Sequence, residues 1–455
     1  MGNSLKASLG SWHIWGLAIG LGGMGEYFGW SYGWDKAGTL GFLVAATFVS
    51  VMYVAFIFSF AELSAAIPQA GGPFAYARRA FGAKMAFLAG FATLVEFLFA
   101  PPAIAMAIGA YFNFQFHLAD PKIVAIGVYA IFISLNILGV RLAATLELIM
   151  AILAVLELLV FMGIVGPSFS MANFVAHGWA GEDHFSLSTF HGIFAAVPFA
   201  IWLFLAIEGA AMAAEETENP QKNIPKAFLS AILTLVFLAT GVIAATGGVG
   251  DWRLFANIND PLPQAMKAVV GANSPWLHML VMIGLFGLLA SFNGIVLAYS
   301  RQIFALSRAG FLPKFLGAVN DKFQTPHAAI IAGGLVGVLA IMGDSLKFDG
   351  QSLTASLIIM SVLGAIIMYI TSMLSLFVLR IKEPQLNRPY RAICYPVFPA
   401  IALAFAFVCL TTVFYYNIKV SFVFFGLMAV TYFIFTIIDH HYALTEEEEL
   451  ILNQV

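Results

Sequence analysis

Charged residues are scarce in this chain. Asp, Glu, Lys and Arg together make up 10% of its 455 residues, whereas an average soluble domain has about 25%. Hydrophobic residues account for 61% and the mean hydropathy is +0.92. A chain this apolar cannot cover a water-facing surface with polar groups, which excludes a soluble enzyme. Its formal net charge of -3 also lacks the basic excess of a nucleic-acid-binding protein.

Cysteine and the signatures of catalytic sites are also nearly absent. Of the two cysteines, Cys394 lies in a basic loop and Cys409 in an apolar span, so no disulfide framework is expected. We find no phosphate-binding loop, no His/Cys cluster with metal-ligand spacing and no nucleophile elbow. We therefore expect no enzyme activity, no cofactor and no metal. The N-terminus lacks a signal-peptide pattern, so the first apolar span is expected to be retained.

Long apolar runs dominate the sequence. A membrane-crossing helix needs about 20 mostly apolar residues, and this rule predicts about twelve spans. Placing the N-terminus in the cytoplasm assigns 15 Lys and Arg residues to inside segments and 6 to outside segments, which fixes the orientation with both termini cytoplasmic. The predicted limits are 11–33, 39–67, 85–113, 121–139, 142–166, 190–212, 226–248, 276–302, 326–343, 353–379, 396–416 and 419–438.

Spans one and six are predicted to be interrupted. Span one has glycine at seven of the eighteen positions 16–33, and each glycine weakens a helix by about 1 kcal/mol relative to alanine. Span six contains Glu208 and Gly209 within an apolar run. Close packing through small residues is the alternative for span one. Interruptions five spans apart instead favour an inverted repeat around a midplane site. The expected units are 11–166, 190–379, 396–438 and a cytoplasmic tail, 439–455.

Several carboxylates lie inside the predicted spans, where each costs about 2.5–3.5 kcal/mol at a helix centre. No Lys or Arg lies deep in a span to pair with them, so these groups are protonated, face water or meet a cation brought from outside. Transport of a small cation uses the last two options, and a carboxyl removed from water is also a candidate proton carrier. The carboxylates are Glu26, Glu62, Glu96, Glu157 and Glu208.

Aromatic residues accompany the two interruptions. Tyr27 follows Glu26 and Trp202 precedes Glu208, and an ammonium over an aromatic face gains about 0.5–2 kcal/mol. Ordinary packing against lipid or core explains such rings equally well. If a half-helix starts after Gly25, its positive end meets Glu26 and not a substrate carboxylate, so we expect a substrate that lacks one. The alternative is that Glu26 merely caps this half-helix.

Recurrent motifs resemble the amino acid–polyamine–organocation (APC) superfamily, and this resemblance implies a LeuT-type fold with two inverted five-helix repeats and two further helices. The motifs are PQAGGPFAY at 68–76, EETENP at 215–220 with Ile224-Pro225, Arg301, RAG at 308–310 with Leu312-Pro313, and RPY at 388–390.

Within that superfamily the chain is most similar to bacterial ethanolamine permeases. The similarity rests on GEYFGW at 25–30, Glu96-Phe97 with APPAIA at 100–105, and SFNG at 291–294; the sequence departs from the pattern at Gly23-Met24. The resemblance implies that residues 23–25 form the unwound, substrate-binding part of helix one. Many amino acid members carry a lysine in helix five that stands in for sodium, but span five here has only Glu147 and Glu157.

These observations predict an all-α polytopic permease of the bacterial inner (plasma) membrane that imports ethanolamine or a close small amine by alternating access, with proton coupling. Ser291 and Asn293 are expected either to face the cavity or to make interhelical hydrogen bonds. The alternatives are an amino acid permease or exchanger of the same fold, a sensor or channel, and a membrane-embedded enzyme. The expected substrate site comprises Gly23, Met24, Gly25, Glu26, Tyr27, Glu96, Trp202, Glu208, Ser291 and Asn293, and the candidates for proton coupling are Glu96, Glu157 and Glu208.

Overall fold

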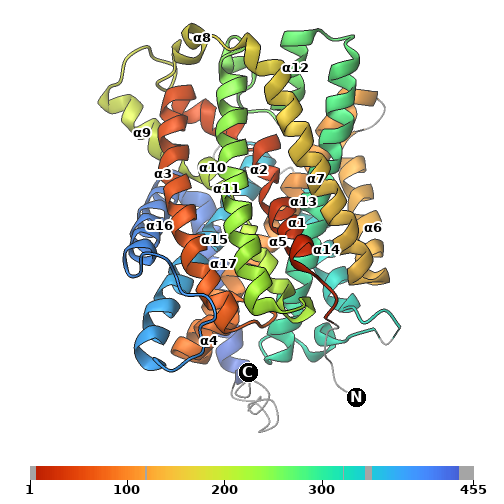
Figure 1. Ribbon diagram of the computed structural model, residues 1–455, viewed down its shortest axis with the longest axis vertical. Coiled ribbons are helices and arrows are strands. Elements are labelled where there is room, and N and C mark those ends of the chain that lie inside the picture. Colours follow the sequence, from red (N-terminus) through yellow and green to blue (C-terminus); the bar gives the residue numbers. More distant parts are fainter. Residues whose placement is uncertain (1–6, 118–119, 321, 344–350, 440–455) are drawn as a thin grey trace.

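The computed structural model describes residues 7–117, 120–320, 322–343 and 351–439. Within these ranges the chain forms helices joined by turns and no β-strand (Figure 1). Ten helices in the described residues are long and apolar enough to cross a membrane. The expected all-α polytopic membrane fold is therefore confirmed. Of the predicted tail, 439–455, all but residue 439 lies outside the described residues.

The first span is interrupted, as predicted. Helix α1 (Ser11–Gly22) is followed by a single turn, α2 (Met24–Tyr27), and then by the long helix α3 (Trp30–Ala66). Gly29 joins α2 to α3 with a φ of 93°, a conformation that residues with a Cβ rarely adopt. The expectation that the second half-helix starts after Gly25 is therefore corrected, because the long half begins only at Trp30. A further break at Gly38 divides α3 between spans one and two.

The sixth span is interrupted as well. Helices α9 (Leu187–Ala195) and α10 (Val197–Trp202) precede four residues in turn conformation, and a 3-10 helix, η2 (Ile207–Glu216), completes the span. Ala206 has a left-handed φ of 71°. The break therefore lies at 203–206, and Glu208 is the second residue after it.

Spans three, four, five and seven to twelve are each a single helix. Most limits agree with the prediction within a few residues, but α13 continues past the predicted end at 302, because its polar last turns are held by ion pairs. The helices are α5 (Ala83–Phe116), α6 (Pro121–Leu138), α7 (Val140–Val165), α11 (Pro220–Gly247), α13 (Pro275–Arg308), α14 (His327–Met342), α15 (Leu353–Lys382), α16 (Val397–Tyr416) and α17 (Ile418–Asp439).

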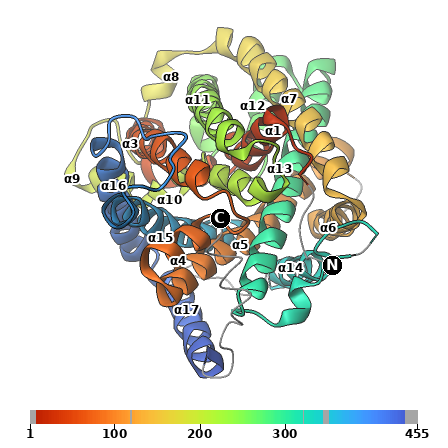
Figure 2. The ribbon, with the colours of Figure 1, turned by 60° about the horizontal axis from the view of Figure 1, so that its bottom comes forward.

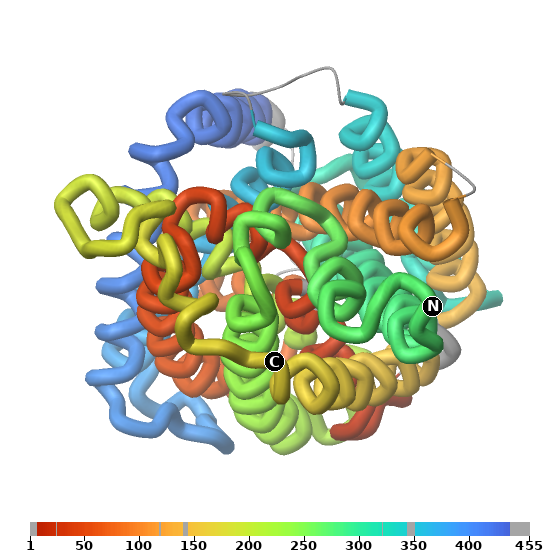
Figure 3. The backbone as a smooth tube through the Cα atoms, turned by 90° about the horizontal axis from the view of Figure 1, so that it is seen from above, coloured from red at the N-terminus to blue at the C-terminus, as the bar shows by residue number. Residues whose placement is uncertain are grey.

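The interrupted spans lie inside the bundle. Helix α1 packs against α7, α11, α13 and η2, and α5 packs against α13 and α15. Figures 2 and 3 show these helices surrounding the first span, with α16 and α17 at the periphery. Short helices lie at the two ends of the bundle in Figure 1: α4 (Pro73–Phe81) and η4 (Lys314–Gly317) at the lower end, and η1 (Gly166–Ser168), α8 (Met171–Val175), η3 (Trp252–Leu254) and α12 (Pro261–Val270) at the upper end.

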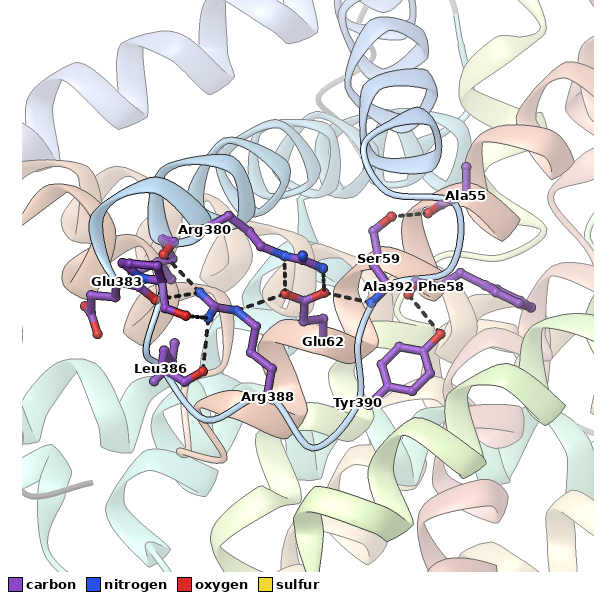
Figure 4. A network of polar contacts seen from close by, with 12 residues as sticks. Ala55, Phe58, Ser59, Glu62, Arg380, Glu383, Leu386, Arg388, Tyr390 and Ala392 are labelled. Atoms are coloured by element: carbon purple, nitrogen blue, oxygen red, sulfur yellow. Dashed lines mark hydrogen bonds and ion pairs between the residues drawn. The ribbon is translucent and has the colours of Figure 1, made fainter.

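A network of ion pairs ties α3 to α15 and to the following loop at the lower end (Figure 4). The carboxylate of Glu62 accepts hydrogen bonds from Arg380 at 2.7 and 2.6 Å and from the backbone N–H of Ala392 at 2.7 Å, and Arg388 lies 3.1 Å away. The expectation that Glu62 has no Arg partner is therefore wrong. The arginines come from the end of α15 and from the loop after it, so no span had to contain a cation.

Candidate functional site

The two interruptions cross each other backbone to backbone. A Cβ added at Gly25 would clash with the Cα of Leu203 and with the carbonyl oxygen of Trp202. Only glycine allows this approach, because any side chain on residue 25 would need the same space. In the last turn of α1, the carbonyl of Leu21 accepts a hydrogen bond of 3.2 Å from Ser291 of α13. The breaks predicted from sequence thus form one junction at the centre of the bundle.

A pair of carboxyl groups lies beside this junction. Glu96 on α5 and Glu208 in η2 are fully buried and close enough to interact electrostatically. None of their four carboxyl oxygens has a hydrogen-bond partner within the described residues. Burying a charge without a partner costs several kcal/mol, so this pair calls for protons or for a cation from outside the chain.

The helix around Glu96 leaves backbone acceptors nearby. Pro101 and Pro102 lie inside α5, and because proline has no N–H, the carbonyls of Phe97 and Leu98 lose their helical donors. The backbone carbonyl of Glu96 itself accepts a hydrogen bond of 2.8 Å from Ser361 of α15. This part of α5 therefore adds neutral acceptors next to the carboxyl pair.

Aromatic side chains line the same region. The hydroxyl groups of Tyr53 and Tyr369 lie 2.6 Å apart, and both tyrosines interact electrostatically with Glu208 and Glu96. The ring of Phe204, within the sixth-span break, lies 5.2 Å from that of Tyr53. Tyr53 and Tyr369 did not emerge from the sequence, because nothing local distinguishes them among the chain's 14 tyrosines. Their position shows that the carboxyl pair has both polar hydroxyls and aromatic faces around it.

Trp202 of the sixth span and Glu26 of the first span lie near the first-span residues 26–29. The indole of Trp202 packs edge-on against Phe28 at 5.5 Å and against Gly29. Glu26 is fully buried and both of its carboxyl oxygens lack a hydrogen-bond partner. Its backbone carbonyl accepts a 3.0 Å hydrogen bond from Trp30. Glu26 belongs to the short turn α2, so it comes before the long helix α3 and does not form the start of that helix.

Tyr27 points away from the carboxyl pair and toward α7. Its hydroxyl donates to Glu157 at 2.7 Å, and its backbone carbonyl accepts from Tyr111 of α5 at 3.0 Å. Glu157, expected as a candidate for proton coupling, therefore belongs to a second polar cluster that bridges α2, α5 and α7. The Met24 side chain lies outside the described part of the structure.

Asn293 also faces α7 and not the carboxyl pair. It donates to Glu147 at 2.9 Å and accepts from Asn136 of α6 at 2.8 Å. Of the two roles considered for this residue, the structure shows interhelical hydrogen bonding. The sequence-predicted residues therefore separate into a central group around Glu96 and Glu208, with Gly25, Ser291 and Trp202 at the crossing, and two groups on α7.

Both ends of the bundle are closed over this centre. At the lower end the buried Arg301 of α13 pairs with Glu216 at the end of η2 at 2.9 Å, and Arg308 pairs with Glu215 at 2.7 Å. The N-terminal segment crosses the same place, because the N–H groups of Ser8 and Leu9 donate to the carbonyl of Glu216 at 2.9 Å.

The upper end is closed by the loop before α12. Ser31 donates to the carbonyl of Ile258 at 2.7 Å, and Tyr32 donates to Asn259 at 2.7 Å. The rings of Trp34 and Trp252 meet edge to face at 6.4 Å. The central carboxyl groups, Glu96 and Glu208, have no exposure to solvent.

Comparison with known proteins agrees with this architecture. A family model described as amino acid permease matches residues 10–438. An uncharacterised transporter of Rhizobium meliloti is 27% identical, with coverage of 89% of this chain and 86% of its own length. The branched-chain amino acid permease BcaP of Bacillus subtilis is 27% identical, with coverage of 88% and 87%. The methylthioribose transporter of Bacillus subtilis is 26% identical, with coverage of 76% and 75%.

Proposed function

The chain belongs to the amino acid permease family, and we propose that it imports a small cationic amine, with ethanolamine as the leading candidate. One observation carries the proposal. Glu96 and Glu208 face each other in a buried site with the Tyr369 hydroxyl nearby, and none of their four carboxyl oxygens accepts a hydrogen bond of ordinary length and angle among the described residues. An ammonium group brings the charge and the N–H donors that this pair lacks.

The surroundings fit such a cation. Tyr53, Tyr369 and Phe204 offer aromatic faces and hydroxyl groups next to the carboxyl pair, and a cation over such a face gains about 0.5–2 kcal/mol, more where water is excluded. The carbonyls of Phe97 and Leu98, whose helical donors Pro101 and Pro102 lack, are candidate acceptors for a primary amine or a hydroxyl group. Glu26, buried next to Gly25 of the crossing, would repel a substrate carboxylate. A small amine without a carboxylate fits all these features.

Alternating access would move the substrate past these residues. In this scheme 11–166 and 190–379 are two inverted repeats, 396–438 adds two helices, and the membrane is the bacterial inner membrane with both termini in the cytoplasm. Helices α4 and α12 support the repeat, because each is a short helix with proline in its first turn and follows the second helix of its repeat. The lower end in Figure 1 is then the cytoplasmic end.

Protons are the coupling ion that we propose. Two neighbouring carboxylates in a dry site do not both stay ionised without a cation. Glu96 and Glu208 can therefore exchange protons for the substrate amine, and Glu157 can hold a proton in its own cluster with Tyr27.

A carboxylate-bearing substrate is the second candidate. The relatives that carry a substrate in their names include branched-chain amino acid permeases of Bacillus subtilis and Lactococcus lactis. An amino acid would place its carboxylate at the unwound segment around Gly23–Gly25, and Glu26 would then act only as a structural residue. Exchange of one amine or amino acid for another is compatible with the same site.

Labelled ethanolamine uptake into proteoliposomes tests the proposal, with choline, alanine, leucine and putrescine as competitors. We expect saturable uptake that alanine and leucine do not block. Glu96→Gln and Glu208→Gln should each reduce uptake by about tenfold or more, because a lost charge-assisted hydrogen bond costs about 1.5–3 kcal/mol. The matched control is Glu182→Gln, at an exposed loop residue. Saturable leucine uptake without ethanolamine uptake would overturn the amine proposal.

A further inference from the structure

A cavity remains between three helices at the lower end of the bundle in Figure 1. It has a volume of about 100 Å³ and lies between the start of α5, the end of α13 with the turn after it, and the last part of α17. Because a buried water needs only about 10–15 Å³, this space is large enough for several atoms of a ligand. Its lining includes Phe87, Phe91, Phe311, Thr431, Ile434 and Phe435.

The wall of this cavity is apolar and does not favour water. Phenylalanine rings form much of it, and the ring of Phe435 lies 4.8 Å from that of Phe87 and 4.8 Å from that of Phe311. Thr431 brings a hydroxyl group, but that group is engaged with the carbonyl of Leu427 on its own helix at 2.8 Å. Apolar cavities of this kind stay dry and bind apolar molecules. The cavity is therefore suited to hydrocarbon.

The cavity is bordered by a surface that faces lipid. Ile434 lines the cavity and is 48% exposed, and the adjacent Phe433 is 66% exposed. Both belong to α17, which lies at the edge of the bundle in Figure 2. Around a membrane protein, the lipid tails take the place of solvent at such an apolar surface. An acyl chain of the bilayer can therefore reach the cavity beside Ile434.

A positive charge lies on the same helix face, nearer the end of the bundle. Lys84 precedes Phe87 by three positions and Phe91 by seven, so the three residues share one face of α5. At about 1.5 Å per residue, Lys84 lies about 10 Å closer to the helix start than Phe91. Its side chain is exposed and has no ion pair or hydrogen bond among the described residues.

The start of α5 lacks the negative charge that helix starts commonly carry. Its N-cap, Gly82, offers no side chain to the free N–H groups, and the first turn has no acidic residue. The positive end of the helix and the ammonium of Lys84 therefore favour an anion at the same place. A Cβ built at Gly82 would have no atom within 4 Å, so this place is open.

We propose that this cavity binds an acyl chain of an anionic phospholipid, whose phosphate lies at Lys84. The acyl chain enters beside Ile434 and lies against Phe87 and Phe435, where it joins α17 to α5 and to the end of α13. A helix of a second copy of this chain does not fit, because a helix with its side chains is about 10–12 Å across. The proposal is independent of the identity of the transported substrate.

The test uses the full chain in phosphatidylcholine liposomes that contain a small share of phosphatidylglycerol with a photoreactive diazirine in one acyl chain. After illumination, mass spectrometry of peptides locates the cross-links. We expect them to concentrate on the cavity residues of α5, α13 and α17. Cross-links spread evenly over the exposed apolar residues of α6, α7 and α17 would overturn the proposal. This readout needs only the wild-type chain, so it does not depend on whether a variant folds.

Two variants test the two ends of the lipid. Thr431→Trp fills the cavity and should lower cross-linking of its lining by about tenfold or more, whereas Thr411→Trp, at an exposed residue of α16, should not. Lys84→Gln should lower capture of phosphatidylglycerol by about fivefold and leave that of a photoreactive phosphatidylcholine unchanged; Lys222→Gln, at an exposed residue of α11, is its control. Equal effects of variant and control in either pair would overturn the proposal.

Native mass spectrometry distinguishes the other occupant. A phospholipid that stays bound to the wild-type chain and is lost with Thr431→Trp supports the proposal. A dimer that Thr431→Trp disrupts, without a bound phospholipid, would assign the cavity to a second copy of this chain and overturn it.

Discussion

Glu62 of α3 and Arg380 of α15 form a two-pronged ion pair, with the guanidinium Nε and Nη2 donating to the two carboxyl oxygens at 2.7 and 2.6 Å. The Glu62 side chain is 1% exposed, and the ring of Tyr395 covers the guanidinium at 4.2 Å. The pair therefore fixes α3 against α15 independently of the substrate region.

Removal of the Glu62 charge should destabilise the protein strongly. Glu62→Gln leaves Arg380 and the nearly buried Arg388 without their carboxylate, and breaking a buried pair costs about 3–5 kcal/mol. The matched control is Glu383→Gln, whose pair with Arg79 is about one-third exposed and contributes about 1 kcal/mol or less. Thermal unfolding in detergent measures both. Equal effects of the two variants would show that burial does not strengthen the Glu62 network.

The backbone crossing predicts a large effect from one methyl group. Gly25→Ala forces a Cβ into Leu203 and Trp202, and overpacking of this kind costs about 1–3 kcal/mol. We expect ethanolamine uptake to fall by about tenfold, the fold-change that 1.4 kcal/mol represents. Gly163→Ala in α7, where no atom lies within 4 Å of the new Cβ, should leave uptake unchanged. Uptake equal in the two variants would contradict the close approach.

The hydroxyl pair should contribute to substrate affinity. Tyr369→Phe removes the partner of the Tyr53 hydroxyl, 2.6 Å away, beside Glu208. Because a hydrogen bond contributes about 0.5–1.5 kcal/mol, the half-saturating ethanolamine concentration should rise by about twofold to tenfold. Tyr432→Phe on the peripheral α17 is the control. An unchanged half-saturating concentration would place Tyr369 outside the substrate's environment.

Acid should weaken the link between α4 and the end of α15. The hydrogen bonds from Arg79 lower the pKa of Glu383. Its contribution to stability is therefore present above the ordinary glutamate pKa, about 4.3, and is lost as the pH falls through the lowered value. The difference in unfolding temperature between wild type and Glu383→Gln should be constant near neutral pH and vanish in acid. A difference that grows in acid would contradict this assignment.

Local features of the sequence predicted the two helix interruptions, but they did not predict which distant residues pair with each other. Glycine density and a charge within an apolar run are visible in a single segment, so the interruptions near Gly25 and Glu208 could be predicted. Glu62 pairs with an arginine 318 residues away, and Tyr53 pairs with a tyrosine 316 residues away. No local pattern encodes such pairings, because they depend on how distant helices pack.

Glu147 illustrates the same limit. Its position in span five was visible as a carboxylate in an apolar run, yet its contact with Gly20 and its bond to Asn293, 146 residues away, depend on the packing of three helices. Ser291 and Asn293 form a polar pair in span eight, for which the sequence predicts either a place in the cavity or interhelical hydrogen bonds. On a helix, two residues separated by one position point in different directions, and here Ser291 faces α1 while Asn293 faces α7.

The contact between Gly25 and Leu203 also limits how the protein can change shape. Two separated hinges would let each interrupted span bend by itself. Here the unwound stretches touch through their main chains, with no side chain between them to yield. At this contact the two interrupted spans cannot bend independently, because bending of one displaces main-chain atoms of the other.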